Sequence, residues 1–493
     1  MSARAIAAVD LGAESGRVFV GRFDGARIEL TEVHRFPNGA RAADGRLRWD
    51  MGYLWTQVRD GLAKAGPVDS VGVDTWGLDF GLLDGTGELT GDPVSHRDPR
   101  TRGVLAEAAR RTSRERLYEA TGTQLLEINT VYQLYAGQHA GELTGARLLL
   151  MLPDLFHRLL SGSAVAEYTA VSTTGAYDMA RGEWATGLLD ELGIPTEILP
   201  EVMDAGTDLG PLRPGLGDPR TRVIAPASHD TASAVVGVPF ADPAAGYVSS
   251  GTWSLVGVET GGAVVTEEAR RANITNEGGA YETIRLLRNC MGLWLLQECR
   301  RQWAHEGHEH PYGDLVRVAA EAPGGVSVVN PDHPDFVQPG DMPARIRDYC
   351  RRTGQPVPDG VAATVRCVLD SLAFGYRATF EDLEAVTGRP VPAVHIVGGG
   401  SRNGLLNRLT ADVCDRPVVT GPVEATALGN VLVQLVTLGE LAGLDQAREV
   451  VRAGEPTQVI EPAGDGRWAD LYGRYRTWAA ADLAAVGAGE PAR

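Results

Sequence analysis

The amino-acid sequence predicts an α/β protein built from two related domains. Two observations lead to this prediction: apolar strands alternate with helical segments, and one strand–turn–strand unit occurs twice. Residues 5–30, "AIAAVDLGAESGRVFVGRFDGARIEL", read as an apolar strand, a glycine-containing turn and an alternating strand, followed by a second turn at Asp24–Gly25. Residues 246–265, "GYVSSGTWSLVGVETGGAVV", repeat this order. The repetition indicates two domains on one plan.

The rest of the chain supplies the helices and further strands of this plan. Apolar residues at three- and four-residue spacing predict helices over 50–66, 103–122 and 365–388, each ending near glycine. Short buried strands are predicted within 70–80, 221–228 and 393–400. A chain of 493 residues is too long for one hydrophobic core. The segment 237–246 is rich in proline and glycine, so we place the domains at 1–240 and 241–493.

Composition and charge narrow the class of protein. Charged residues make up 22% and hydrophobic residues 43%, which is ordinary for a globular protein. The net charge of −18 argues against nucleic acid or an anionic membrane as partner. The apolar runs are too short for a signal-peptide core or a membrane span, so a cytoplasmic protein is expected. The five cysteines lack the CxxC spacing of zinc and redox motifs. Cys350 and Cys367 flank one loop and are expected to be neighbours, mostly reduced.

Three glycine-containing turns are candidates for a nucleotide site. The turn "DLGAESGR" (10–17) can expose successive backbone N–H groups to phosphate, and Asp10 at the strand end can meet Mg²⁺, directly or through water. The turn "SSGTWS" (249–254) holds the equivalent place in the second half, and "VHIVGGGSRNGLLNRLTADV" (394–413) brings three glycines before a helix. Each turn alone is equally typical of an ordinary β-turn, and none is a Walker or GxGxxG motif.

Asp230 is the isolated acid of "IAPASHDTASAVVGVPF" (224–240). A carboxylate among apolar neighbours is costly unless it is paired or bound to a cation. One interpretation is a helix N-cap, because aspartate before a small apolar run is a good cap. The other is a reacting group. This stretch alone leaves both open.

Together these residues resemble the FGGY carbohydrate kinases of the actin-like ATPase superfamily. The resemblance runs from about residue 5 to about residue 450, in the family's order and spacing. Six segments are similar to family members that act on L-rhamnulose: "GVDTWGLDFGLLD" (72–84), "PASHDTASAV" (226–235), "SSGTWSL" (249–255), "ANITNEGGA" (272–280), "NCMGLWLLQ" (289–297) and "GPVEATALGN" (421–430).

The resemblance implies two related actin-like, ribonuclease H-like ATPase domains with a ligand cleft between them. Residues 1–240 would carry the sugar site, the first phosphate loop and the catalytic aspartate, and residues 241–493 the second phosphate loop and the adenosine site. The implied activity is ATP- and Mg²⁺-dependent phosphorylation of L-rhamnulose to L-rhamnulose 1-phosphate in L-rhamnose catabolism. The implied enzyme is a cytoplasmic monomer or small homo-oligomer.

The same resemblance implies roles for individual residues. Asp230 would be the catalytic base, and Asp10 the metal contact. ATP would be bound by Ala13, Glu14, Ser15, Gly16, Arg17, Thr252, Gln297 and Gly399. The sugar would be bound by Gly77, His229, Asp230, Thr231 and Asn289.

Two positions leave questions open. Glu14 stands where the family usually has a small hydroxyl residue, and a carboxylate beside a triphosphate is repulsive unless it points away or finds a cation. Arg17 is its nearest basic neighbour in sequence. Trp76, beside Gly77, can either stack on the sugar or fill the core.

The realistic competing function is an FGGY kinase for another ketose, such as L-fuculose or D-xylulose. A chaperone-type actin-like ATPase would need a separate peptide-binding domain, and a sugar-responsive regulator would need a basic DNA-binding extension. The sequence offers no segment for either.

Overall fold

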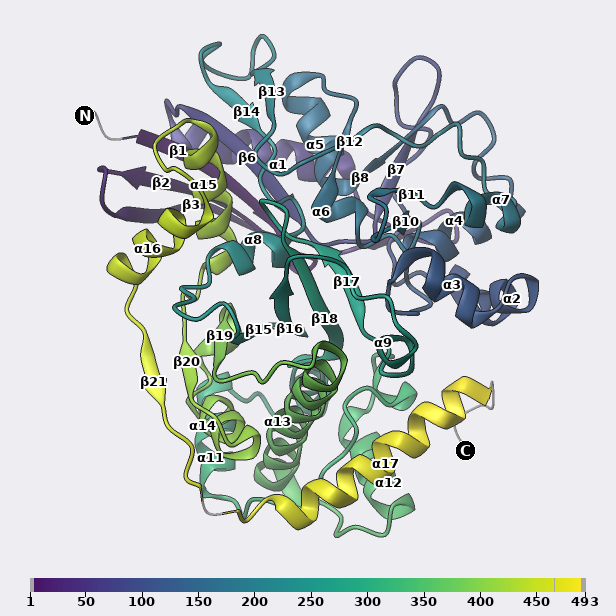
Figure 1. Cartoon of the computed structure of the whole chain (residues 1–493), viewed down its shortest axis with the longest axis vertical. Coiled ribbons are helices and arrows are strands. Elements are labelled where there is room, and N and C mark those ends of the chain that lie inside the picture. The colour runs from purple at the N-terminus through teal and green to yellow at the C-terminus, as the bar shows by residue number, and fades with distance from the viewer. Residues whose placement is uncertain (1–3, 465, 489–493) are drawn as a thin grey trace. The chain divides into compact units, whose positions relative to one another are not determined.

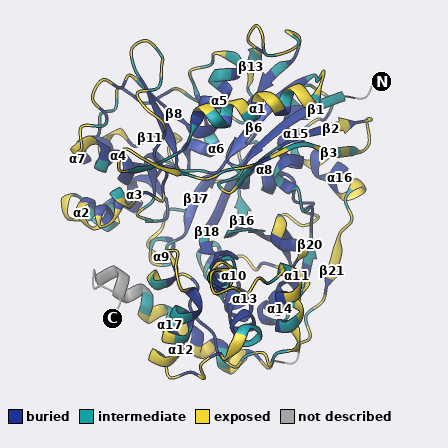
Figure 2. Ribbon diagram, turned by 180° about the vertical axis from the view of Figure 1, so that it is seen from behind, coloured by how far each residue is buried: buried dark blue, intermediate teal, exposed yellow. Residues whose placement is uncertain are grey.

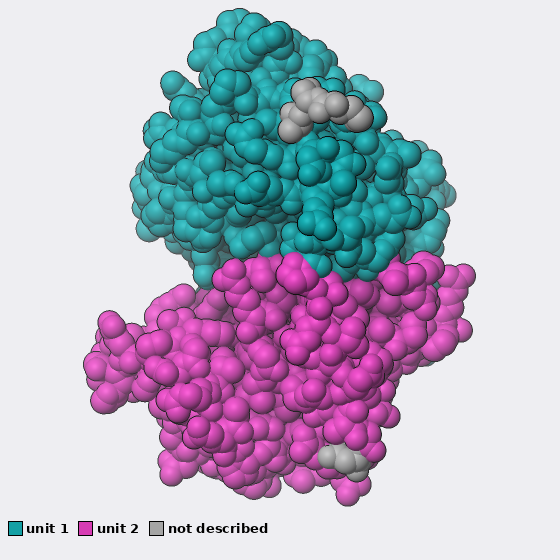
Figure 3. All heavy atoms as spheres, turned by 90° about the vertical axis from the view of Figure 1, so that its left-hand side faces the viewer, with its two compact units in different colours: residues 1–239, 259–286, 424–455 teal, residues 240–258, 287–423, 456–493 magenta. Residues whose placement is uncertain are grey.

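The chain forms two compact units (Figure 3). The computed structural model describes residues 4–464 and 466–488. The first unit comprises residues 1–239, 259–286 and 424–455, and the second comprises 240–258, 287–423 and 456–493. The chain first passes between the units at Pro239–Phe240, next to the boundary expected at residue 240. Two later segments return to the first unit, so each unit is discontinuous in sequence.

The first unit is built around one large sheet, and a second large sheet lies mostly in the second unit, with its residues 275–278 and 284–286 assigned to the first (Figure 1). The first sheet has the order β13-β14-β6-β1-β2-β3 and the second the order β17-β18-β16-β15-β19-β20-β21. The strands of the first are β1 (Arg4–Leu11), β2 (Ser15–Phe23), β3 (Ile28–Pro37), β6 (Ser70–Thr75), β13 (Asp208–Pro211) and β14 (Arg222–Ile224). Those of the second are β15 (Gly246–Ser250), β16 (Trp253–Thr260), β17 (Thr275–Gly278), β18 (Ile284–Met291), β19 (Val394–Val397), β20 (Val418–Thr420) and β21 (Gln458–Ile460).

The helices and shorter strands complete the two units. The first unit contains α1 (Met51–Ala65), α2 (Val104–Arg111), α3 (Arg114–Thr121), α4 (Thr130–His139), α5 (Leu152–Ser161), α6 (Tyr168–Val171), α7 (Thr186–Leu192), α8 (Asp230–Val236), α9 (Glu267–Arg271), α15 (Ala425–Thr437) and α16 (Leu444–Gly454). The second contains α10 (Trp294–His305), α11 (Tyr312–Glu321), α12 (Met342–Arg352), α13 (Gly360–Thr387), α14 (Gly404–Cys414) and α17 (Ala469–Ala488). Short two-stranded pairs are β4 (Arg41–Ala43) with β5 (Arg46–Arg48), β7 (Phe80–Leu83) with β8 (Leu148–Met151), β9 (Ala166–Glu167) with β12 (Val202–Met203), and β10 (Tyr177–Asp178) with β11 (Glu183–Trp184).

The two sheets share one strand plan. In the first, β1 pairs antiparallel with β2 and parallel with β6; β14 then follows in parallel and β13 antiparallel. In the second, β15 pairs antiparallel with β16 and parallel with β19; β20 follows in parallel and β21 antiparallel. Five consecutive strands therefore agree in order and direction, which confirms the two related domains indicated by the sequence repeat.

The first sheet is covered by helices on both faces, and its inner strands β2, β1 and β6 are mostly buried (Figure 2). Along β1, Ile6 and Ala8 contribute to a core shared with residues of α8 and α15, while Ala7 and Val9 belong to a core shared with α1 and α5. Successive side chains of a strand point to opposite faces, so a strand buried on both faces is continuously apolar. This explains the unbroken apolar run before Asp10.

One predicted helix is interrupted. The segment 103–122 forms α2 and α3 rather than a single helix, and Ser113 separates them. The hydroxyl of Ser113 accepts a hydrogen bond from Arg116 N, so Ser113 is the N-cap of α3. A serine with this local bond begins a new helix more readily than it continues one.

Two further expectations concern the cysteines and membrane-spanning helices, and both can be checked for the described residues. All five cysteines are buried and free, and the Cys350 and Cys367 thiols are hydrogen-bonded neighbours in the second unit. Within the described ranges, no helix is long and apolar enough to cross a membrane.

The crossing of α8 and α15 depends on Gly429. A Cβ placed there would lie 1.8 Å from the backbone oxygen of Ser233. We predict that Gly429→Ala lowers the free energy of unfolding by about 1–3 kcal/mol, because two packed helices must move apart. Gly52→Ala, in α1 of the same unit, is the control, since its Cβ would meet only Asp50 Oδ1 at 3.6 Å. Thermal unfolding should show a lower midpoint for Gly429→Ala alone; equal midpoints would contradict the prediction.

Candidate active site

Two carboxylates lie side by side at the carboxyl end of the first sheet. Asp10 on β1 and Asp74 on β6 are partners in the parallel register of these strands. Asp10 follows Ala8 by two residues and therefore shares its face, the one covered by α8 and α15. Asn430 of α15 donates to Asp74 Oδ2 at 2.6 Å, which places Asp74 on the same face. Asp10 is 4% exposed and Asp74 is fully buried.

Asp230 is the first residue of α8, on this same face. His229 occupies the N-cap position of α8, so the interpretation of Asp230 as the N-cap is wrong. The loop before the helix is tied to the sheet, because Thr75 N donates to Ser228 O at 2.9 Å. The Asp230 side chain keeps 29% of its surface exposed. It is thus held by the fold and still accessible.

Burial and neighbouring charges raise the pKa of all three acids. Burial raises the pKa of Asp10, against the opposing charge of Arg17. Burial and the charge of Asp10 raise the pKa of Asp74 well above its usual value. Burial, with Asp10 next in importance, raises the pKa of Asp230 to about 7. Carboxylates that repel one another in this way ionise together more easily when a cation lies beside them.

Arg17 provides the fixed positive charge of the cluster. It faces Asp10 across the antiparallel pair β1–β2 and forms ion pairs with Asp10 and with Glu424, the residue just before α15. Both terminal nitrogens of the Arg17 guanidinium therefore pair with these two acids. Within the described part of the chain, Arg17 does not pair with Glu14: the Glu14 side chain is exposed, and its backbone oxygen accepts from Asn38 N at 3.0 Å.

The first hairpin has a tightly fixed backbone. Gly12 N donates to Ser15 O at 3.0 Å, and Asn38 Nδ2 donates to Gly12 O at 2.8 Å. A Cβ at Gly16 would lie 2.2 Å from the ring of Phe36, so only glycine fits there. Ala13 and Ser15 remain partly exposed at the tip.

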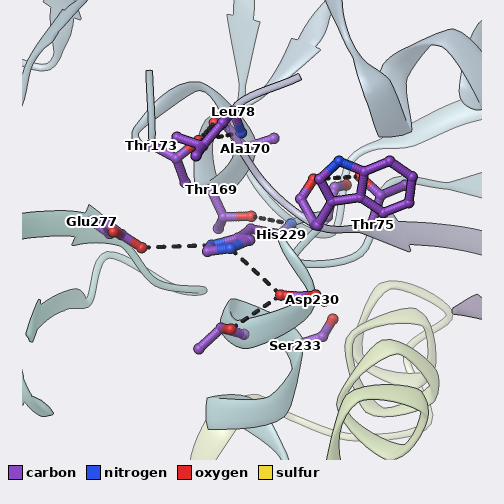
Figure 4. Close-up of polar contacts among 12 residues, drawn as sticks. Thr75, Leu78, Thr169, Ala170, Thr173, His229, Asp230, Ser233 and Glu277 are labelled. Atoms are coloured by element: carbon purple, nitrogen blue, oxygen red, sulfur yellow. Dashed lines mark hydrogen bonds and ion pairs between the residues drawn. The ribbon is translucent and has the colours of Figure 1, made fainter. Parts of the chain in front are cut away.

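The residues around Asp230 form a polar cluster (Figure 4). Thr231 Oγ1 donates to Asp230 Oδ1 at 3.0 Å, and His229 Nε2 lies 3.5 Å from the same oxygen. His229 Nδ1 accepts from Arg285 at 3.0 Å, and Arg285 lies 3.2 Å from Glu277. Burial, with the charge of Arg285, lowers the pKa of His229 well below its usual range. His229 is therefore neutral at physiological pH.

The turn after β6 is held in a strained conformation. Leu78 has a φ of 76°, which is unfavourable for a bulky residue. Its carbonyl accepts from Thr130 Oγ1 at 2.6 Å and Gln133 Nε2 at 3.2 Å, and its N–H donates to Thr173 Oγ1 at 3.2 Å. Such strain persists only where the surroundings enforce it and is typical of binding sites. Gly77, partly exposed, immediately precedes this residue.

Trp76 fills the core in this structure. Its side chain is 7% exposed, its ring lies 4.2 Å from that of Trp49, and its Nε1 donates to Asp79 Oδ2 at 2.8 Å. Of the two interpretations of Trp76, the buried one agrees with this geometry.

The second unit gathers the other predicted nucleotide residues. Gln297 Nε2 donates to Thr252 Oγ1 at 3.4 Å, which joins α10 to the β15–β16 hairpin. A Cβ at Gly400 would lie 2.0 Å from Ser250 Oγ, so the glycine turn packs directly on that hairpin. Gly399 is exposed, and a Cβ there would meet open space. Asn289 is half-buried on β18 in the same unit, whereas the other predicted sugar residues belong to the first unit.

Four residues of the site were not predicted individually. Asp74 and Asn430 join the acid cluster, and Glu424 and Arg285 hold Arg17 and His229. Asp74 carried the same signal as Asp230, because it is an isolated acid in an apolar strand. Glu424, Asn430 and Arg285 gave no such signal, since their partners lie far away in sequence.

Comparisons with known proteins agree with this architecture. Residues 5–237 match the N-terminal domain model of the FGGY family of carbohydrate kinases, and residues 246–438 match its C-terminal domain model. A curated rhamnulokinase from Pectobacterium carotovorum is 41% identical over 99% of both chains. One from Enterococcus faecalis is 40% identical over 93% of this chain and 94% of its own.

Solved structures show the same fold at lower identity. Gluconate kinase from Lactobacillus acidophilus superposes with a TM-score of 0.81 at 17% identity, covering 99% of this chain and 100% of its own. Glycerol kinase from Plasmodium falciparum with ADP gives 0.75 at 14% identity, covering 96% and 97%. With both domain models matched in order and relatives similar over nearly the whole length, this chain belongs to the FGGY family of carbohydrate kinases.

Proposed function

We propose that this protein phosphorylates O1 of L-rhamnulose with ATP, giving L-rhamnulose 1-phosphate. The observation that carries the choice of sugar is the similarity to curated rhamnulokinases, at 40–41% identity over nearly the full chain. Kinases for xylulose and gluconate share the fold at only 17–18% identity. We place the reaction in the cytoplasm, where ATP is available.

Asp230 is the base in this proposal. A general base is most effective when its pKa lies near the working pH, and the pKa of Asp230 is raised to about 7. Its position at the first turn of α8, with part of the carboxylate exposed, lets it accept a proton from a sugar hydroxyl. Transfer of a phosphoryl group depends mainly on alignment and charge stabilisation, so Asp230 also orients the attacking oxygen.

The loop that carries Asp230 is held by buried hydrogen bonds. Glu167 Oε2 accepts from Ser228 N at 3.1 Å and from Thr169 Oγ1 at 2.6 Å. Thr169 Oγ1 in turn accepts from His229 N at 3.0 Å. The two backbone N–H groups before Asp230 are thus fixed by one carboxylate and one hydroxyl. This rigidity supports a base whose position must be accurate to well under 1 Å.

The acid cluster fits a magnesium ion held mainly by phosphate. Among the described residues, no group of three or more histidine, cysteine, aspartate or glutamate side chains forms a metal site by itself. Mg²⁺ usually takes only one or two carboxylates and completes its shell with phosphate and water. We propose Asp10 as its protein contact, directly or through water. Bound there, the ion would neutralise phosphate charge.

The remaining contacts are assigned by chemistry. The backbone of Ala13–Arg17 and the hydroxyl of Thr252 would contact the ATP phosphates, and Gln297 and Gly399 would contact the nucleotide. Gly77, His229, Thr231 and Asn289 would contact the sugar, whose hydroxyl groups need amide, imidazole and hydroxyl partners.

The sugar assignment predicts the outcome of a coupled ADP-release assay. With Mg-ATP and a panel of ketoses, L-rhamnulose should give the highest kcat/KM, and the product should carry phosphate on O1. Glucose serves as the aldose control. Fast turnover of L-fuculose or D-xylulose with none of L-rhamnulose would reject the sugar and leave the kinase class standing.

Asp230→Asn separates chemistry from stability. We expect kcat to fall about 10²–10⁴-fold with a much smaller change in KM, because asparagine cannot accept the proton. The folded-state pKa of about 7 lies above the usual value of 3.8, so ionised Asp230 costs stability as pH rises through this window. The variant should therefore melt at or above the wild-type temperature at pH 8, with the difference vanishing towards pH 4.

The wild-type kcat/KM for sugar should correspondingly fall as pH drops below about 7, because the base must be ionised. A normal turnover in Asp230→Asn, or a clear loss of melting temperature at pH 8, would contradict this role.

Thr169→Val tests the loop that holds Asp230. The change keeps the shape but leaves the buried His229 N–H without its acceptor, which should cost about 1–3 kcal/mol of stability. We expect kcat to fall as well, because the loop loses its fixed position. Thr169→Ser keeps the hydroxyl and should stay close to wild type in both melting and turnover. Equal behaviour of the two variants would show that the hydrogen bond is unimportant.

A further inference from the structure

His229 is enclosed by charged side chains from three elements. Arg285 of β18 donates through Nη2 to His229 Nδ1 at 3.0 Å. Glu277 of β17 lies 3.6 Å from the same nitrogen, and Asp230 of α8 lies 3.5 Å from Nε2. The backbone N–H of His229 is bound by Thr169. Figure 4 shows the imidazole between Glu277 and Asp230. All of these residues belong to the first unit.

The bond from Arg285 decides which ring nitrogen carries the proton. A guanidinium group has only N–H donors and no acceptor. Nδ1 of His229 must therefore present its lone pair, and the proton of the neutral ring lies on Nε2. A second proton on Nδ1 would face the N–H of a cation. The ring can neither exchange its tautomer nor become cationic without breaking this bond.

We propose that Arg285 is a positioning residue that locks His229 as a neutral Nε2–H donor facing the Asp230 carboxylate. The proposal deepens the proposed function, since it assigns separate roles to the two adjacent side chains. Asp230 accepts the proton of the sugar hydroxyl. His229 donates a hydrogen bond through Nε2–H to a sugar oxygen next to that hydroxyl. His229 is thereby prevented from competing as a base.

The neutral form of His229 also keeps Asp230 a stronger base. A cationic imidazole 3.5 Å from Asp230 Oδ1 would stabilise the carboxylate and make it a weaker base. Keeping His229 neutral avoids this loss while still supplying a donor.

Glu277 makes the buried cation tolerable. The Arg285 side chain is fully buried, lies 3.2 Å from Glu277 Oε2, and donates through Nε to Gly278 O at 2.8 Å. A buried charge persists only when it is paired and hydrogen-bonded. Glu277 and Arg285 therefore form one ion pair, and removing Arg285 alone would take this cation away from Glu277.

The test is nuclear magnetic resonance of the full-length protein labelled with ¹⁵N-histidine. His229 is assigned from the signal lost in His229→Gln. In wild type we expect its proton on Nε2 and no titration between pH 6 and 8. A wild-type His229 protonated on Nδ1, exchanging between tautomers, or titrating in this range would overturn the proposal without any further variant.

Two variants test whether Arg285 is what fixes the tautomer of His229. Glu277→Gln/Arg285→Met removes the donor together with its counter-charge. The His229 ring should then exchange between tautomers and its pKa should rise, while burial still holds that pKa below its usual range. Ketose kinase kcat should fall up to about 10²-fold, as expected for a misplaced reacting group. Arg285→Lys retains charge and an N–H donor and should restore the fixed tautomer and part of kcat.

The matched control makes the same pair of substitutions elsewhere in the first unit. Arg270 and Glu267 form an ion pair on α9, so Glu267→Gln/Arg270→Met should leave both the His229 signal and kcat unchanged. An unchanged His229 signal in Glu277→Gln/Arg285→Met would refute the role of Arg285. The resonance requires no substrate, so a wrong choice of sugar would appear only in the ADP-release assay.

Discussion

The burial of neighbouring carboxylates at one end of a sheet is the constraint on which this site depends. Asp10 and Asp74 are forced together because the parallel register of β1 and β6 makes them partners on one face. Asp230 joins them from the start of α8. Such a cluster is stable only with compensating donors and cations, which Arg17 and Asn430 supply in part. A bound cation would supply the rest, so ligand binding would also complete the charge balance of the cluster.

The duplicated strand plan places a similar hairpin in each unit. In each unit the hairpin connects a strand with a parallel neighbour to an antiparallel partner. The copies have diverged in what surrounds them. The β1–β2 hairpin adjoins the acid cluster, whereas the β15–β16 hairpin adjoins Gln297 and the glycine turn before α14. One hairpin therefore lies beside carboxylates, and the other beside an amide side chain and a glycine turn.

Positioning is distributed over residues that never need to touch a ligand. Glu167 and Thr169 fix the backbone before Asp230. Arg285, paired with Glu277, contacts His229 Nδ1 and so leaves the proton of the ring on Nε2. Thr130, Gln133 and Thr173 hold the strained Leu78 turn. Catalysis by proton transfer requires accuracy of this kind, because a small displacement of the base costs much of its effect.

The sequence by itself determined the class and duplication of the fold, because strand alternation, glycine turns and helical spacing are local patterns. It also singled out Asp10, His229 and Asp230, through isolated polar groups in apolar segments and through family resemblance. Only the tertiary structure showed that Arg17 pairs with Asp10 and Glu424 rather than with Glu14, and that His229 occupies the N-cap position of α8.

The same holds for Arg285, whose partner His229 lies 56 residues away, and for Asn430, 356 residues from Asp74. The discontinuity of both units likewise has no local signal. These features arise from contacts between distant segments, and the energy of a buried charge depends on all of its neighbours in space. Local sequence patterns report propensity and burial, but they do not report which charges meet.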